Sequence, residues 1–140
     1  MNFKLQALDH VAVRCMDVER SAKWYAEVLG LVRYDIPEWK PFPVFMLSDG
    51  FGVALFPATD GQAPDALKAR MVQIDHFAFR VTRADFDAAL SQYDRLGLTY
   101  NVQDHTYFHS VYTDDPDGHT VELTTLVVSE ADFEKFNPNN

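Results

Sequence analysis

An α+β fold, built from two βαβββ modules that form a cupped mixed sheet, is predicted by three features of this sequence. First, residues 8–14 read LDHVAVR and residues 74–80 read IDHFAFR, so a strand-like segment recurs after 66 residues. Second, each copy precedes a helix-like stretch that ends in Leu-Gly-Leu, at residues 29–31 and 96–98. Third, strand-like segments with turn residues between them follow each helix. The chain of 140 residues is therefore expected to hold two modules and a short tail.

The domain boundaries follow from this repeat and from a change in composition between the copies. We place the first module at residues 1–57 and the second at residues 72–128. The stretch at 58–71 is mostly polar and contains Gly and Pro, which is typical of a linker. The tail at 129–140 is expected to begin with a short helix and to fray at its end.

In the first module, alternation over residues 8–15 predicts a strand with Val11 and Val13 facing the helix. Asp17 suits the N-cap of that helix, and Gly30 suits the left-handed position that ends it. The apolar face of the helix is expected to consist of Ala22, Tyr25, Ala26 and Leu29. Later strands are expected at residues 31–35, 44–47 and 52–56, with a tight turn at Asp49-Gly50.

The second module repeats this order. A strand is predicted over residues 72–81, and Thr82 with Asp85 resembles a capping box that starts the helix. The apolar face of this helix is expected to consist of Phe86, Ala89, Leu90 and Tyr93. Later strands are expected at residues 98–102, 108–113 and 120–127, with a turn at 115–118.

The charge balance limits the partners. The chain has 12 Lys and Arg against 21 Asp and Glu, a formal net charge of −9. Such a chain repels phosphate backbones and anionic lipid surfaces, so neither a nucleic acid nor a membrane is expected as a partner.

Cysteine usage and hydropathy point to a location. Cys15 is the one cysteine, so a disulfide within the chain and a zinc site of several thiolates are excluded. No apolar run approaches the roughly 20 residues that span a bilayer, and the first residues lack a signal-peptide core. We expect a cytoplasmic protein in which Cys15 is a buried, inert thiol.

Three side chains form a candidate metal site. His10 and His76 occupy the same position of the repeat, on the strand face opposite the helix. Glu122 is a carboxylate in the middle of the last strand, where an ionised group is costly unless it is paired or ligated. If the sheets curve around one cavity, these three side chains converge. Two imidazoles and one carboxylate are the ligands of many non-haem Fe(II) sites, and they also suit Mn(II) or Zn(II).

These residues resemble the vicinal oxygen chelate superfamily, which includes glyoxalase I, type I extradiol dioxygenases, fosfomycin thiol transferases and bleomycin-resistance proteins. The resemblance runs from Leu8 to Leu126. It implies a divalent metal held by the first and last strands of each module, here His10, His76 and Glu122. The fourth ligand position of the superfamily falls at Ala54, which cannot ligate. The chain therefore looks like the three-ligand branch, with Fe(II) favoured and Mn(II), Zn(II) or Ni(II) as alternatives.

Within that branch, the segment from His105 to Glu122 resembles extradiol dioxygenases, because it combines a His, an apolar residue followed by Tyr112, and a Pro-x-Gly turn before the Glu. The resemblance implies a small-molecule substrate, namely a catechol-like ring that dioxygen cleaves beside two hydroxyls that chelate the metal. Tyr112 would bind a substrate oxygen and His105 would shuttle protons. Phe45 and Phe51, together with Tyr112, are the expected substrate-binding residues.

The sequence leaves alternatives to a dioxygenase open. Extradiol enzymes place an acid–base His near residues 49–52, where this chain has none, so His105 or His109 would have to take that role or the reaction differs. A glyoxalase I-like lyase or isomerase is one alternative, and a drug-binding protein of the bleomycin-resistance type is another. A fosfomycin thiol transferase is disfavoured, since Ala12 replaces the usual Thr and no Arg follows Arg95.

A homodimer is expected, and the metal site could lie within one chain or be shared across the dimer.

Overall fold

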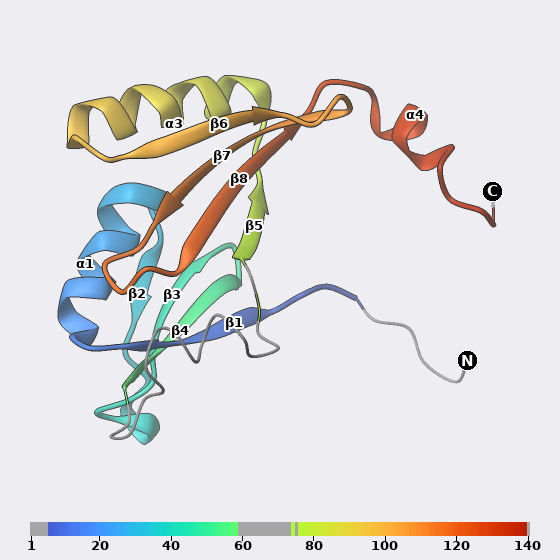
Figure 1. The fold of residues 1–140 in the computed structure, drawn as a ribbon. Helices are drawn as coiled ribbons and strands as arrows, with labels where there is room; N and C mark the ends of the chain where they lie inside the picture. Colours follow the sequence, from blue (N-terminus) through green and yellow to red (C-terminus); the bar gives the residue numbers. More distant parts are fainter. Residues whose placement is uncertain (1–5, 59–73, 75, 140) are drawn as a thin grey trace. The chain divides into compact units, whose positions relative to one another are not determined.

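The computed structural model describes residues 6–58, 74 and 76–139 (Figure 1). It divides the chain into two compact units, Met1–Gln73 and Ile74–Asn140. Almost all of the predicted linker at 58–71 lies outside the described residues. Among the described residues, no helix is long and apolar enough to cross a membrane.

The first unit is a four-stranded mixed sheet with one long helix. Its strand order is β1-β4-β3-β2, with β1 and β4 parallel and the other pairs antiparallel. Helix α1 packs against β2, β3 and β4. The elements are β1 (His10–Cys15), α1 (Val18–Leu29), β2 (Val32–Tyr34), the short 3₁₀ helix η1 (Pro37–Trp39), β3 (Val44–Ser48) and β4 (Phe51–Pro57).

The second unit has the same architecture. Its strand order is β5-β8-β7-β6, with β5 and β8 parallel and the other pairs antiparallel. Its elements are β5 (His76–Arg80), α3 (Arg83–Leu96), β6 (Tyr100–Asp104), β7 (Phe108–Asp114), β8 (Thr120–Leu126) and the C-terminal helix α4 (Glu130–Glu134). Two four-stranded mixed sheets with few helices confirm the predicted α+β class.

The helix ends obey the local signals of the sequence. The Asp17 side chain accepts a hydrogen bond from the Arg20 backbone at the start of α1, and Gly30 ends the helix at φ 68°. Thr82 caps α3 through Asp85 N, and Gly97 ends it, also at φ 68°. These caps satisfy backbone groups that a helix end otherwise leaves unbonded.

The buried face of α1 differs from the predicted one. Ala22 and Tyr25 are buried, but Ala26 is exposed and Leu29 is only half-buried. Val18 and Val28 are buried instead. Apolar residues lie on both neighbouring stripes of this helix, so periodicity alone could not decide which stripe the sheet covers. In α3 the prediction holds better, with Phe86 and Tyr93 buried.

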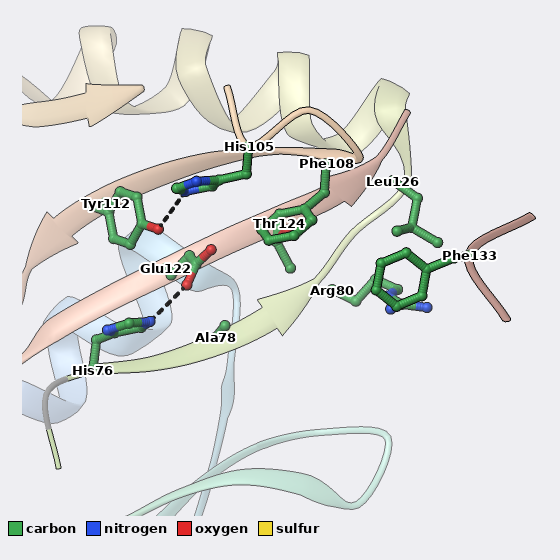
Figure 2. A pocket seen from close by; sticks show the side chains of 10 residues that line it. All are labelled: His76, Ala78, Arg80, His105, Phe108, Tyr112, Glu122, Thr124, Leu126 and Phe133. Carbon is green, nitrogen blue, oxygen red and sulfur yellow. Dashed lines mark hydrogen bonds and ion pairs between the residues drawn. The ribbon is translucent and has the colours of Figure 1, made fainter. Parts of the chain in front are cut away.

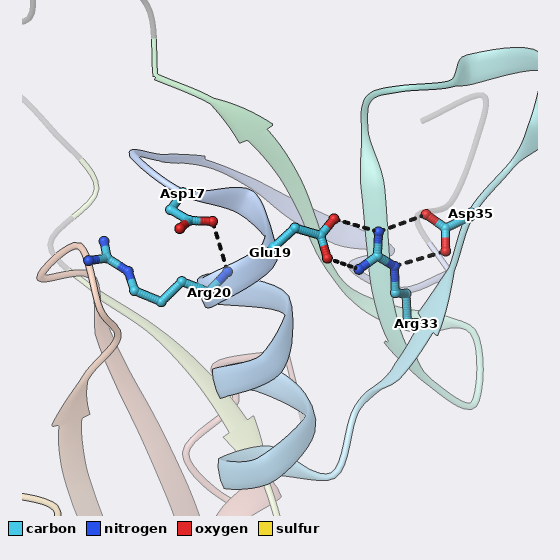
Figure 3. A network of polar contacts seen from close by, with 5 residues as sticks. All are labelled: Asp17, Glu19, Arg20, Arg33 and Asp35. Carbon is cyan, nitrogen blue, oxygen red and sulfur yellow. Dashed lines mark hydrogen bonds and ion pairs between the residues drawn. The ribbon is translucent and has the colours of Figure 1, made fainter.

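An arginine joins α1 to the edge strand β2. Arg33 Nη1 and Nη2 donate to the two carboxylate oxygens of Glu19 at 2.6 and 2.9 Å (Figure 3). The same guanidinium donates from Nε and Nη2 to Asp35 at 2.8 and 3.1 Å. The hydrogen bonds from Arg33 lower the pKa of both carboxyl groups. This network fixes the first turn of the helix over the edge strand.

Close backbone packing places the hairpin of β3 and β4. Asp49 and Gly50 adopt positive φ, as the predicted two-residue turn requires. The next glycine, Gly52, pairs with His10 of β1 and Leu47 of β3. A Cβ at Gly52 would lie 2.1 Å from the backbone oxygen of Met46. Only glycine allows the strands to approach this closely beside His10.

Candidate metal and substrate site

The second unit brings His76 and Glu122 into contact. His76 lies on the face of β5 that Ala78 and Arg80 share, since side chains alternate along a strand. Glu122 of β8 pairs with Ala78 across the parallel ladder. His76 Nε2 lies 3.0 Å from Glu122 Oε2 (Figure 2). Glu122 is 4% exposed, so its carboxylate depends on partners inside the protein.

Ser110 of β7 supplies one such partner. Its Oγ donates to Glu122 Oε1 at 2.5 Å, and both residues are buried. A hydrogen bond to an ionised oxygen is short and strong. The two carboxylate oxygens therefore have different neighbours, a hydroxyl on Oε1 and an imidazole on Oε2.

His105 and Tyr112 form a second pair in the same unit. His105 Nε2 lies within hydrogen-bond distance of the Tyr112 hydroxyl, at 2.9 Å. Tyr112 is directly opposite Glu122 in the antiparallel ladder of β7 and β8. Its ring meets the His76 ring edge-on, with centroids 5.7 Å apart. Tyr112 therefore lies beside both pairs.

A cavity of about 340 Å³ joins these groups. The close-up in Figure 2 shows the two hydrogen-bonded pairs at one end, and Arg80, Leu126 and Phe133 together at the other. Ala78, Phe108 and Thr124 complete its lining. The volume suits a small organic molecule.

His10 belongs to the first unit, together with Phe45 and Phe51. Its Nδ1 lies 2.6 Å from Asp9 Oδ1, an arrangement that leaves Nε2 as the nitrogen for a ligand. Its ring meets Phe45 edge-on at 5.2 Å. Phe51 is 41% exposed. Neither phenylalanine is among the residues that line the cavity of the second unit.

Strand register relates the two units residue by residue. Ala12 pairs with Ala54 in the first unit as Ala78 pairs with Glu122 in the second. Across the neighbouring ladder, Phe45 opposes Ala54 where Tyr112 opposes Glu122. The structure thus places Ala54 at the position equivalent to Glu122. One copy of the module carries the polar groups and the other carries apolar ones.

The donor atoms of the second unit fit a divalent metal. Two ligands in adjacent positions at about 2.1 Å from a metal are separated by roughly 3 Å, and the His76–Glu122 contact is 3.0 Å. Imidazole nitrogen and carboxylate oxygen suit Fe(II), Mn(II) and Zn(II). Within the described part of the chain, no three His, Cys, Asp or Glu side chains gather as a metal-binding group. The expected third ligand, His10, lies in the other unit.

The sequence did not single out six residues of the cavity lining, or Ser110 as the partner of Glu122: the six are Ala78, Arg80, Phe108, Thr124, Leu126 and Phe133. The one sequence signal for Ser110 is that it lies two residues from Tyr112 in the same strand and so shares its face. In the same way, Arg80 lies four residues from His76 and shares its face. Phe133 lies on α4 and reaches the cavity through tertiary packing, for which a tail sequence carries no local signal. His109 and His119 do not line the cavity. His109 contacts Arg83 Nη1 at 2.7 Å instead.

Two βαβββ units, each with a four-stranded mixed sheet, define a class of α+β proteins, and in this chain the second unit carries a histidine–carboxylate pair. The chain belongs to the Glyoxalase/Bleomycin resistance protein/Dioxygenase superfamily, whose family model matches residues 7–123. Members of this superfamily are mostly metalloenzymes that act on small molecules. The expected superfamily is thereby confirmed.

Three relatives illustrate the range within it. The chain is 26% identical over 119 residues to the glutathione transferase FosA of Serratia marcescens. The aligned residues cover 85% of this chain and 80% of that protein. The structure called oxidase ChaP-H2 is 26% identical with a TM-score of 0.64, covering 89% of this chain and 94% of the other. A glyoxalase/dioxygenase of Nostoc punctiforme has a TM-score of 0.73 at 19% identity, covering 91% and 99%, and shows the fold alone.

Proposed function

We propose that this protein is a divalent-metal dioxygenase of the extradiol type, which acts on a small catechol-like substrate with two vicinal oxygens. The observation that carries the proposal is the contact of His76 with a Ser110-bound Glu122, beside the His105–Tyr112 pair, in one cavity. The 26% identity to a structure named as an oxidase supports oxygen chemistry.

His10, His76 and Glu122 would hold the metal. His10 is included because it is the repeat equivalent of His76 and because Asp9 holds its Nδ1, as a carboxylate commonly does for a ligating histidine. Fe(II) is the proposed metal, and Mn(II), Zn(II) or Ni(II) would suit the same donors. When bound, the metal supplies a Lewis acid and a template for the two substrate oxygens.

The chain's own groups handle binding and protons. Ser110 orients the Glu122 carboxylate by donating to Oε1. The Tyr112 hydroxyl lies close enough to this pair to hydrogen-bond a substrate oxygen. His105 Nε2, 2.9 Å from that hydroxyl, can accept or return the proton during the reaction. Phe108 and Leu126 add apolar surface to the lining of the cavity.

Metal content and dioxygen uptake test the proposal. The protein is purified without oxygen, stripped, reloaded with Fe(II), and assayed with a panel of catechols for dioxygen consumption and ring-opened product. His10→Ala, His76→Ala and Glu122→Gln should each lose metal, while His109→Ala, a histidine outside the cavity, should retain it. Full metal occupancy in His76→Ala, or no uptake by the Fe(II) protein with any catechol, contradicts the proposal.

A thiol transferase is the second candidate, and the 26% identity to the glutathione transferase FosA favours it. Ala12 and the absence of an arginine after Arg95 count against it. Incubation of the Mn(II) protein with glutathione and fosfomycin distinguishes the two candidates, because only the transferase would form the adduct.

The expected homodimer and cytoplasmic location remain part of the proposal. Dimers are common in the superfamily. Sedimentation equilibrium of the purified chain at micromolar concentration tests the dimer. A monomer at all concentrations contradicts it.

A further inference from the structure

A cationic side chain lines the end of the cavity away from His76. Arg80 lies on the same face of β5, four residues further along, which corresponds to about 13 Å of strand. Its guanidinium lies near Leu126 and Phe133 in Figure 2. Arg80 places a positive charge at the edge of a cavity in a chain with net charge −9, and such a charge can attract an anionic group of a ligand.

Arg80 can bind an anionic group in addition to its contact with Glu130. Its Nη1 contacts Glu130 Oε1 of α4 at 3.3 Å, and the two side chains are 56% and 83% exposed. An exposed single contact of this kind is weak. A guanidinium has five N–H donors in a planar fork that matches a carboxylate. Glu130 therefore orients Arg80 and competes only modestly with a ligand.

The repeat shows what distinguishes Arg80 from its counterpart, Arg14. In the first unit, Arg14 pairs in register with Phe56, stacks on its ring at 5.1 Å, and donates to the Pro57 carbonyl. In the second unit, Arg80 pairs with Thr124. The smaller Thr124 has no ring to hold the guanidinium, and it lines the cavity itself. The same arginine position is packed against its own sheet in one unit and faces a cavity in the other.

Apolar side chains line the cavity between and beside its polar groups. Phe108 lies next to His105, with ring centroids 5.0 Å apart. Leu126 and Phe133 lie at the Arg80 end (Figure 2), and Phe133 comes from α4, the helix that carries Glu130. A ligand that reached from His76 to Arg80 would bury apolar surface against these side chains.

We propose that the substrate carries a carboxylate at the end opposite its chelating oxygens, that Arg80 binds this carboxylate, and that Phe108, Leu126 and Phe133 contact the apolar part of the substrate. Arg80 is thus a specificity-determining residue. The inference deepens the proposed function and rests on it only for the chelating end, since the contact with Arg80 requires no metal.

The test uses metal-stripped protein and two probes without vicinal oxygens, 3-phenylpropanoate and 3-phenylpropanamide. By titration calorimetry, the wild type should bind the propanoate at least about 10-fold more tightly than the amide, as expected for one charge-assisted pair. In Arg80→Gln the preference should disappear, and in Arg80→Lys it should persist in part. In Glu130→Gln, which removes the competing carboxylate, propanoate affinity should rise.

Arg83→Gln is the matched control, because it removes the same charge from an arginine outside the cavity lining and should keep the preference. Equal or undetectable binding of both probes by the wild type overturns the inference. So does a preference that survives in Arg80→Gln. Melting temperatures of all variants confirm that they fold.

A second measurement separates this inference from the proposed function. Metal-loaded protein should gain affinity when the phenyl group of the propanoate is replaced by 3,4-dihydroxyphenyl. A carboxylate preference without that gain contradicts the proposed function and leaves the role of Arg80 standing. The gain without a carboxylate preference overturns the role of Arg80 alone.

Discussion

Ser110 Oγ lies 2.5 Å from Glu122 Oε1, on the carboxylate oxygen that does not face His76. The hydroxyl therefore fixes the orientation of the proposed ligand. Partners of this kind typically contribute 10- to 100-fold in metal affinity. We expect Ser110→Ala to bind Fe(II) or Mn(II) about 10- to 100-fold more weakly, measured by competition with a chelator. Ser91→Ala, on the exposed side of α3, is the control. Unchanged affinity in Ser110→Ala would show that the hydrogen bond has no role in binding.

The Tyr112 hydroxyl is expected to act in the reaction without holding the metal. Tyr112→Phe removes the group that lies 2.9 Å from His105 Nε2. Turnover of the best catechol should fall by about 100-fold, the range for one acid–base group, while metal content stays at the wild-type level. Tyr107→Phe, whose ring packs on Phe136, should leave turnover unchanged. Loss of metal from Tyr112→Phe would assign the residue a structural role instead.

Tyr93 should make stability sensitive to alkaline pH. Burial raises the pKa of Tyr93 to about 12 from its ordinary value of 10.0. The folded state keeps the proton where the unfolded chain loses it, so stability is intact below pH 10 and is lost as pH rises toward 12. Urea unfolding across this range should show a steeper decline for the wild type than for Tyr93→Phe.

The same variant should be more stable than the wild type at neutral pH. The Tyr93 hydroxyl is the buried side-chain polar atom that has no hydrogen-bond partner within the described residues. Its removal should increase the free energy of unfolding by about 1 kcal/mol, because an unsatisfied buried group is costly. A loss of stability in Tyr93→Phe would reveal a partner for the hydroxyl in solution.

Gly52→Ala should be severely destabilising. The new Cβ would lie 2.1 Å from the Met46 backbone oxygen, so strands β3 and β4 must separate. We expect a loss of about 3 kcal/mol or more in chemical denaturation. Gly118→Ala is the comparison, since it has open space but a φ of 84°, and it should lose about 1–2 kcal/mol. Equal losses would mean that strand spacing adapts to the methyl group.

The Arg33 network should make stability sensitive to acid. Hydrogen bonds from Arg33 lower the pKa of Glu19 and of Asp35 from 4.5 and 3.8. Their contribution is present above these ordinary values and is lost as pH falls through the lowered ones. The melting temperature of Arg33→Met should therefore change less with acidification than that of the wild type. If the melting temperatures of the two proteins fall equally with pH, the network does not contribute to acid sensitivity. The same conclusion follows if added salt does not reduce the difference between the two melting temperatures.

Local and repeated features could be predicted from the sequence. Asp17, Gly30 and Thr82 act through their own turns, so the predicted caps of the two long helices are confirmed. Alternation within two separate strands predicts that His76 and Glu122 lie on the same face, and their 3.0 Å contact agrees with that expectation. Their role as metal ligands is still a prediction.

Features that depend on tertiary packing could not be predicted. Val28 is buried in place of Ala26 because the sheet covers one of two possible stripes of α1. Phe133 lines the cavity because of where the tail packs, and no periodic pattern marks it. The prediction that Phe45 and Phe51 bind substrate rests on their aromatic rings, and an aromatic ring does not indicate which unit holds the cavity.

The register that aligns Ala54 with Glu122 and Phe45 with Tyr112 has a consequence for mutational tolerance. If the internal repeat arose by duplication, selection for chemistry can act on one copy of an equivalent pair, as at Ala54 and Glu122. Saturation mutagenesis scored on activity should therefore be asymmetric, with positions 110, 112, 122 and 124 far more restricted than their counterparts 43, 45, 54 and 56. At these four pairs of positions, the proposed chemistry would restrict the second half, while the first half would be restricted there only by folding and stability.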